Sequence, residues 1–134
     1  MAEWQTVRLG TIVLTNKNTY SPKEYWQFVN YLDTGNITMN RVDEIRYINT
    51  SMDKLPSRAR RKVKLNSIIY STVRPNQLHY GIVKEQPENF LVSTGFVVID
   101  VDFEKMKRKL KKFVPLIALP LILLVLVLNS FFML

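Results

Sequence analysis

NSIIYSTV at residues 66–73 and FLVSTGFVVIDV at residues 90–101 are the most strand-like stretches of the chain. Both are dominated by β-branched and aromatic residues, which favour β-strands. Turn-forming residues bound them, because Arg74-Pro75-Asn76 follows the first stretch and Gln86-Pro87-Glu88-Asn89 precedes the second. Gly95 interrupts the second predicted strand.

Further elements are predicted on either side of these strands. The run WQTVRLGTIVLT at residues 4–15 indicates an N-terminal strand, and residues 80–83 indicate another. Ser21-Pro22-Lys23-Glu24 has helix-capping chemistry, so we expect a short helix through the aromatic residues that end at Phe28.

A sharp turn is expected within YLDTGNITMN at residues 31–40. The short apolar pieces predict a strand that gives way to a turn with positive φ at Gly35 or Asn36. With the strands above, this pattern predicts one β-rich α+β domain over residues 1–102.

Length and composition limit the function. The chain of 134 residues has room for one such domain, and it has no cysteine and one histidine, His79. Thiolate metal sites and a cysteine nucleophile are therefore excluded, and we expect no cofactor and no metal ion. The N-terminus lacks a secretory signal, so a cytoplasmic location is the expectation.

Two groups of polar side chains suit a nucleic acid. The run SRARRKVK at residues 57–64 is basic, and cations there suit phosphate oxygens or guanine edges. A solvated basic face is the alternative. The second group follows strand 66–73 in a loop stiffened by Pro75, where amides match adenine edges, although a polar turn that satisfies its own backbone fits the same residues. The members of this second group are Arg74, Asn76, Gln77, His79 and Tyr80.

The blocks LPSRARRKVKLNSIIYSTVRPNQLHYGIV and ENFLVSTGFVVI, with the earlier YLDTGNIT, resemble the target-recognition domain of type I restriction-modification specificity subunits. The resemblance covers most of residues 4–101. It implies a non-catalytic component that reads one half of a split target on double-stranded DNA. It also implies methyltransferase and endonuclease partner subunits, which carry the enzymatic activities.

Carried over to this sequence, the resemblance suggests a set of DNA-binding residues. Arg58, Arg60 and Arg61 are expected to contact phosphates. The expected base-edge readers are Asn76, Gln77, His79 and Tyr80, while Arg74 either binds DNA or braces its loop. The set is completed by Lys62, Ser93 and Thr94, although the block Ser93-Thr94-Gly95 has an architectural alternative.

The resemblance stops after Val101, where the family pattern would continue toward a spacer helix. The chain is thus expected to hold an incomplete recognition domain, for which docking of the methyltransferase is in doubt. Six Lys and Arg side chains lie in residues 105–112, against one acidic side chain, Glu104, in residues 103–134. We expect residues 103–112 to form a basic linker.

Residues 113–134 (FVPLIALPLILLVLVLNSFFML) carry no charge and predict a C-terminal apolar helix. A helix of this length would span about 33 Å, enough for the hydrocarbon core of a bilayer. A small tail-anchored membrane protein with a lipid-facing basic segment is therefore the alternative function. A frame slip in the lysine-rich run is another explanation of this tail, which sequencing of the underlying DNA would test.

Overall fold

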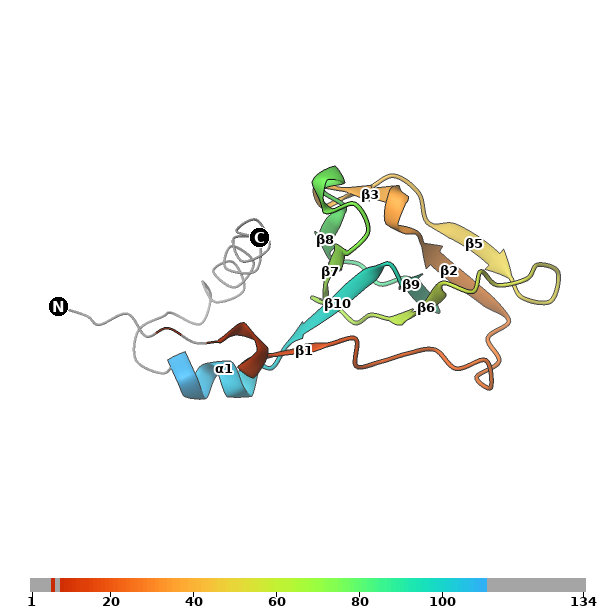
Figure 1. The fold of residues 1–134 in the computed structure, drawn as a ribbon. Coiled ribbons are helices and arrows are strands. Elements are labelled where there is room, and N and C mark those ends of the chain that lie inside the picture. Colours follow the sequence, from red (N-terminus) through yellow and green to blue (C-terminus); the bar gives the residue numbers. More distant parts are fainter. Residues whose placement is uncertain (1–5, 7, 111–134) are drawn as a thin grey trace. The chain divides into compact units, whose positions relative to one another are not determined.

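The computed structural model describes Thr6 and residues 8–110, and divides the chain into two compact units, residues 14–100 and residues 1–13 with 101–134. The strands and helices are shown in Figure 1. In chain order they are η1 (Leu9–Thr11), β1 (Val13–Thr15), β2 (Phe28–Leu32), η2 (Thr34–Asn36), β3 (Ile37–Thr38), β4 (Arg41–Val42), β5 (Arg46–Asn49), β6 (Ala59–Lys62), β7 (Ile68–Ser71), η3 (Pro75–Gln77), β8 (Tyr80–Ile82), β9 (Phe90–Ser93), β10 (Phe96–Val101) and α1 (Phe103–Leu110).

Two four-stranded sheets form the framework. The strand order is β1-β10-β7-β8 in the first and β5-β2-β9-β6 in the second. In the second sheet β2 and β9 are parallel, with Asn30 opposite Phe90, while the pairs β2–β5 and β6–β9 are antiparallel. β9 and β10 are joined by a tight turn, so the chain passes directly from one sheet to the other.

A separate two-stranded hairpin is formed by β3 and β4. Thr38 pairs with Arg41, which leaves Met39 and Asn40 as a two-residue turn, both with positive φ. Positive φ at both central residues is the geometry that matches the natural twist of a hairpin. The hairpin lies next to β8 (Figure 1), because the Met39 and Asn40 N–H groups donate to the Leu78 and Tyr80 carbonyls at 2.9 and 2.8 Å.

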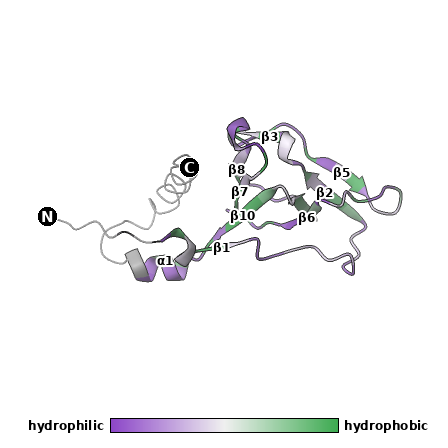
Figure 2. Cartoon of the chain, viewed as in Figure 1, coloured by the Kyte–Doolittle hydropathy of each residue, from purple (hydrophilic) through white to green (hydrophobic). Residues whose placement is uncertain are grey.

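Apolar side chains from both sheets share one core, which agrees with the hydrophobic colour of β10 in Figure 2. Its buried members are Leu32, Ile37, Val63, Ile69, Val83, Phe90, Val92, Phe96 and Val98. A second cluster lies on the opposite face of β2 and β9, where Trp26 and Leu55 pack against it. Its buried members are Tyr20, Val29, Tyr31, Ile48, Ala59 and Leu91. Burial on both faces explains the continuous apolar sequence of Phe90, Leu91 and Val92 in β9.

The predicted strands after residue 66 are confirmed as β7, β8, β9 and β10, with the interruption at Gly95. The predicted helix that ends at Phe28 is wrong. Only one turn forms there, closed by the Glu24 N–H that donates to the Ser21 carbonyl at 2.9 Å, and Phe28 begins β2. Pairing with β5 and β9 outweighs the local capping signal.

The predicted positive φ at Gly35 or Asn36 is also wrong. The Asp33 carboxylate accepts a hydrogen bond from the Thr34 N–H at 2.8 Å and starts η2, so neither residue needs a left-handed backbone. The left-handed turn lies later, at Met39 and Asn40.

Residues 103–110 of the predicted basic linker form α1. Asp102 starts this helix, because its carboxylate accepts from the Lys105 N–H at 3.0 Å and forms an ion pair with the Lys105 ammonium at 3.3 Å. No helix in the part of the chain that is described, Thr6 and residues 8–110, is long and apolar enough to cross a membrane. The predicted apolar helix at residues 113–134 lies outside these residues.

Candidate nucleic-acid interface

Four connections meet at one edge of the two sheets. Because β2 and β9 are parallel, the residues that follow them lie at the same edge. The Thr94 N–H donates to the Arg58 carbonyl at 2.8 Å, and the Thr72 N–H donates to the Gly95 carbonyl at 2.9 Å. We call this surface the loop edge and define it as Asp33, Thr34, Arg58, Thr72, Val73, Arg74, Thr94 and Gly95.

Gly95 allows these loops to approach closely. A Cβ atom at this position would lie 2.8 Å from the Thr34 Cγ2 atom and 3.5 Å from the Val73 Cγ2 atom. The first distance is too short for any side chain there without a shift of Thr34. Gly95 thus brings together the loops after β2, β7 and β9, and the architectural interpretation of its sequence block is supported at this residue.

Two exposed arginines lie on the loop edge. Arg58 precedes β6 and Arg74 follows β7, and both are exposed. Neither guanidinium forms a hydrogen bond or an ion pair within the part of the chain that the structure describes. Both cations are therefore available to an anionic ligand.

The polar turn η3 continues the loop edge beyond Arg74. Arg74 and Leu78, at its two ends, have left-handed backbones with φ of 52° and 58°. Pro75 occupies its first position, and Asn76 and Gln77 are exposed. Figure 2 shows this turn as strongly hydrophilic. The predicted amide-bearing loop thus forms a short, conformationally restricted turn with its amides toward solvent.

His79 is held by contacts within the fold. Its Nδ1 atom lies 2.6 Å from the Ile37 carbonyl, which can only accept, so Nδ1 carries the proton and donates. Its Nε2 atom, the acceptor in this tautomer, lies 3.0 Å from the side-chain amide of Gln77. The imidazole is half-buried and ties β3 to η3, so its polar atoms are already occupied. Base reading by His79 therefore stays a prediction, and both ring nitrogens already have partners within the fold.

Tyr80 is likewise held by the fold. Its ring stacks on Tyr70 at a centroid distance of 6.4 Å and an interplanar angle of 12°, and the side chain is half-buried. Stacking of this kind stabilises the cross-strand pair between β7 and β8. The stacking makes Tyr80 part of the scaffold, and base reading by Tyr80 stays a prediction.

The basic run does not form one cationic surface. Ala59 pairs with Ser93 and Arg61 with Val92, so a bulge at Arg60 interrupts the register of β6. Of the four cations predicted to bind DNA in this run, only Arg58 is exposed, because Arg60, Arg61 and Lys62 are half-buried.

The half-buried cations of β6 differ in their contacts within the domain. The Lys62 ammonium donates to the Glu24 carboxylate at 2.5 Å and lies 5.2 Å from the centre of the Trp26 ring. Arg60 Nε donates to the Ser57 carbonyl at 3.4 Å. Arg61 Nε is buried and has no hydrogen-bond partner within the described residues. Among the cations predicted to contact phosphates, Arg58, which precedes β6, is therefore the exposed one, and phosphate binding by Arg60 and Arg61 stays a prediction.

Ser93 and Thr94 differ in exposure. Ser93 is fully buried, and its hydroxyl accepts from the Gly95 N–H at 3.3 Å, so it shapes the turn and presents nothing to a ligand. Thr94 is exposed on the loop edge. Beneath it, burial raises the pKa of Tyr31, whose hydroxyl donates to the Asp33 carboxylate at 3.1 Å. This polar contact fixes the loop that follows β2.

Sequence reasoning missed Thr34, which belongs to the loop edge. Its contact with Gly95 links positions 34 and 95, and no local pattern indicates a pairing over that separation. The fragment YLDTGNIT signals a turn at this point, but it does not indicate which other turn lies beside it.

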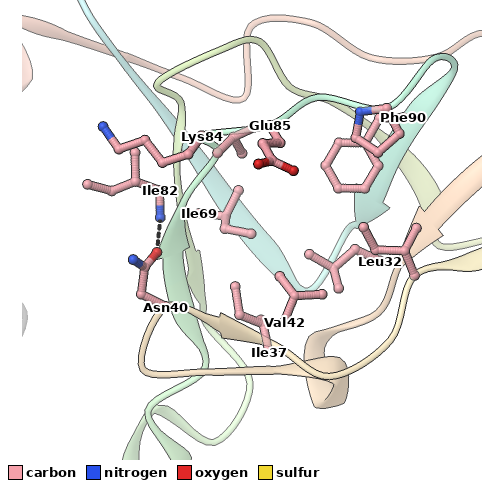
Figure 3. A pocket seen from close by; sticks show the side chains of 12 residues that line it. Leu32, Ile37, Asn40, Val42, Ile69, Ile82, Lys84, Glu85 and Phe90 are labelled. Atoms are coloured by element: carbon pink, nitrogen blue, oxygen red, sulfur yellow. Dashed lines mark hydrogen bonds between the residues drawn. The ribbon is translucent and has the colours of Figure 1, made fainter.

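An apolar pocket lies between the β3–β4 hairpin and the sheets (Figure 3), with a volume of about 300 Å³. Ile37, Val42, Ile69, Ile82 and Phe90 are among its lining residues. Polar groups at its rim are Asn40, Lys84 and Glu85. This lining has no pair of a nucleophile and a base, and no group of three potential metal ligands occurs among the described residues.

Comparison with known proteins connects this geometry to a family. The type I restriction enzyme HindI specificity subunit of Haemophilus influenzae is 29% identical over 100 residues, which cover 75% of this chain. The crystal structure of the HsdS subunit from Thermoanaerobacter tengcongensis is similar over 73% of this chain, with 29% identity and a TM-score of 0.62. The chain is a relative of type I restriction specificity subunits.

A further solved chain supports this relationship. It comes from work on complex assembly and conformational transition of the type I R-M system, and it matches with 28% identity and a TM-score of 0.61. The chain spans about a fifth of the length of the curated specificity subunit and about a quarter of each solved chain. No protein-family model matches the chain.

Proposed function

We propose that this specificity-subunit relative recognises a short sequence on double-stranded DNA through its loop edge and η3. The observation that carries the proposal is the placement of two free, exposed arginines beside two exposed amides on a domain similar to HsdS subunits. Loops mounted on a rigid sheet framework can hold such groups in a fixed arrangement.

The residues divide by chemistry. Arg58 and Arg74 would bind phosphate oxygens and supply affinity that depends on salt. Asn76 presents an amide that matches the adenine edge in the major groove, and Thr94 adds a hydroxyl. Gln77 would add a second amide on exchanging its contact with His79 for one with a base. Arg60, Arg61 and Lys62 would contribute only to the local positive potential, since they are half-buried.

The proposal includes partners. The relatives are named as parts of type I restriction systems, and we propose that separate methyltransferase and endonuclease subunits carry the reaction chemistry. We propose that this chain is a non-catalytic component that acts beside such subunits. Docking to them would require surfaces beyond the matched quarter of the HsdS chain.

The test is binding of the full chain to a pool of fluorescein-labelled random duplexes, measured by anisotropy at two salt concentrations and followed by repeated selection. We expect affinity that falls with salt and an enriched, asymmetric half-site. Binding that stays without sequence preference through every round of selection would contradict the proposal.

The basic segment before the tail could bind duplex DNA without sequence preference. A double variant, Lys107→Ala with Arg108→Ala, controls for this binding because both side chains lie on α1, away from the loop edge in sequence. The variant should lose part of its affinity for the random pool and keep the enriched half-site.

A further inference from the structure

The tip of the β3–β4 hairpin combines exposure with a costly backbone. Met39 has φ of 44° and is 58% exposed. A left-handed backbone costs a residue other than glycine roughly 1 kcal/mol, and asparagine tolerates it best. A long apolar side chain that stays mostly exposed in this position offsets little of that cost by burial, which points to a contact outside the domain.

The hairpin is held firmly, so the position of Met39 is defined. The Ile82 N–H donates to Asn40 Oδ1 at 2.8 Å, as drawn in Figure 3, and the His79 imidazole donates to the Ile37 carbonyl. On the inner side, Ile37 and Val42 line the apolar pocket. A Cβ atom on Gly81 would lie 2.7 Å from Ile37 Cδ1, which shows how closely β8 meets the hairpin.

The tip lies directly beside the end of η3. The Met39 N–H donates to the Leu78 carbonyl at 2.9 Å, and Leu78 follows the exposed amides of Asn76 and Gln77. In Figure 1 the tip of β3 lies beside the green turn η3. The Arg41 side chain, next in the hairpin, is 86% exposed, and within the described residues it has only a 4.0 Å ion pair with Asp43. Apolar, amide and cationic side chains thus project from two segments fixed to each other.

We propose that the hairpin tip is a second DNA-reading element, in which Met39 makes an apolar contact with a base edge, of the kind that thymine methyl groups offer in the major groove. This inference rests on the proposed function and adds to it a specificity-determining residue. Arg41 binds the neighbouring phosphate, and the ties through Asn40 and His79 keep the two reading elements in register.

The experiment measures the ratio of affinities for the selected half-site and a scrambled duplex, with the full chain and its variants. Met39→Ala should lower this ratio by about 5-fold or more, the usual effect of losing recognition of one base pair. Met39→Gln, which keeps the length of the side chain, should give the same loss, while Met39→Leu should keep the ratio. Affinity for the scrambled duplex should stay within about 2-fold, as expected for a contact to bases rather than phosphates.

Met52→Ala is the matched control, because Met52 is 83% exposed on the turn after β5 and its loss should change neither affinity. If Met39→Ala and Met39→Gln keep the ratio while Arg58→Ala weakens binding to every duplex, the hairpin inference is overturned and the proposed function stands. If the unaltered chain shows no sequence preference, both are overturned.

Discussion

The Ser67 hydroxyl donates a 2.5 Å hydrogen bond to the Asp100 carboxylate, and both side chains are buried between β7 and the end of β10. Ser67 also accepts a hydrogen bond from the Lys64 N–H at 3.0 Å. A carboxylate at 4% exposure needs such a partner, because an unsatisfied buried acceptor keeps its full desolvation cost.

Replacing Ser67 with alanine should therefore destabilise the chain by about 1–3 kcal/mol. The measurement is urea unfolding followed by tryptophan fluorescence. Ser57→Ala is the control, since Ser57 is exposed and its side chain forms no hydrogen bond within the described residues. Equal midpoints for the two variants would show that Asp100 does not depend on Ser67.

Stability should depend on pH through Glu24. The hydrogen bond from Lys62, with that of the Ser21 N–H, holds the pKa of Glu24 below its ordinary value of 4.5. Because the folded-state pKa is depressed, this contribution is present above about pH 4.5 and is lost as the pH falls through the folded-state value. Glu24→Gln should therefore lose less stability between about pH 6 and about pH 3 than the unaltered chain.

Urea midpoints across this pH range test the effect of Glu24. Glu44→Gln serves as the control, because Glu44 is exposed and forms no ion pair or hydrogen bond within the described residues. If Glu24→Gln and the unaltered chain lose the same stability as the pH falls, Glu24 does not contribute to the pH dependence.

Arg58 and Arg74 should each contribute to the affinity for DNA by the same amount whatever the sequence of the duplex. Each alanine variant is expected to lower the slope of log affinity against log salt by about 0.9, the effect of one lost phosphate contact. Lys23→Ala removes an exposed cation from the turn before β2 and should leave the slope unchanged. Anisotropy titrations at four salt concentrations give the slopes. Unaltered slopes for both arginine variants would show that neither arginine contacts a phosphate.

Gly81 should tolerate no side chain. A methyl group there would lie 2.7 Å from Ile37 Cδ1 and 3.0 Å from Asn40 Oδ1, so Gly81→Ala forces the hairpin away from β8. We expect a loss of about 1–3 kcal/mol, typical of overpacking, measured by thermal unfolding. At Gly35 a Cβ atom meets nothing within 4 Å and φ is not positive, so Gly35→Ala is a near-neutral control.

The strands after residue 66 could be predicted because Ile68, Ile69, Phe90 and Val92 are buried in strands with the composition that such strands require. The helix expected before Phe28 failed for a physical reason. The capping signal at Ser21 is local, whereas Phe28 and Val29 gain their pairing and burial from β5 and β9, which lie much later in the chain.

The candidate site was predicted in part. The sequence places Arg74, Asn76 and Gln77 in one turn, as the structure has them. It could not show that His79 binds the Ile37 carbonyl or that Lys62 is paired with Glu24, since both contacts join distant segments. The basic run became part of β6 because it pairs with β9, and the charges of the run do not indicate this pairing.

The parallel pairing of β2 with β9 affects how the chain folds. Asn30 reaches its neighbour Phe90 only after the intervening residues are made, so the central sheet cannot close early in synthesis. Contacts between such distant positions slow folding, and β2, once paired with β5, meanwhile presents unpaired backbone groups on the edge that β9 will take. A ribosome-bound chain would therefore need protection from aggregation until its last strands emerge.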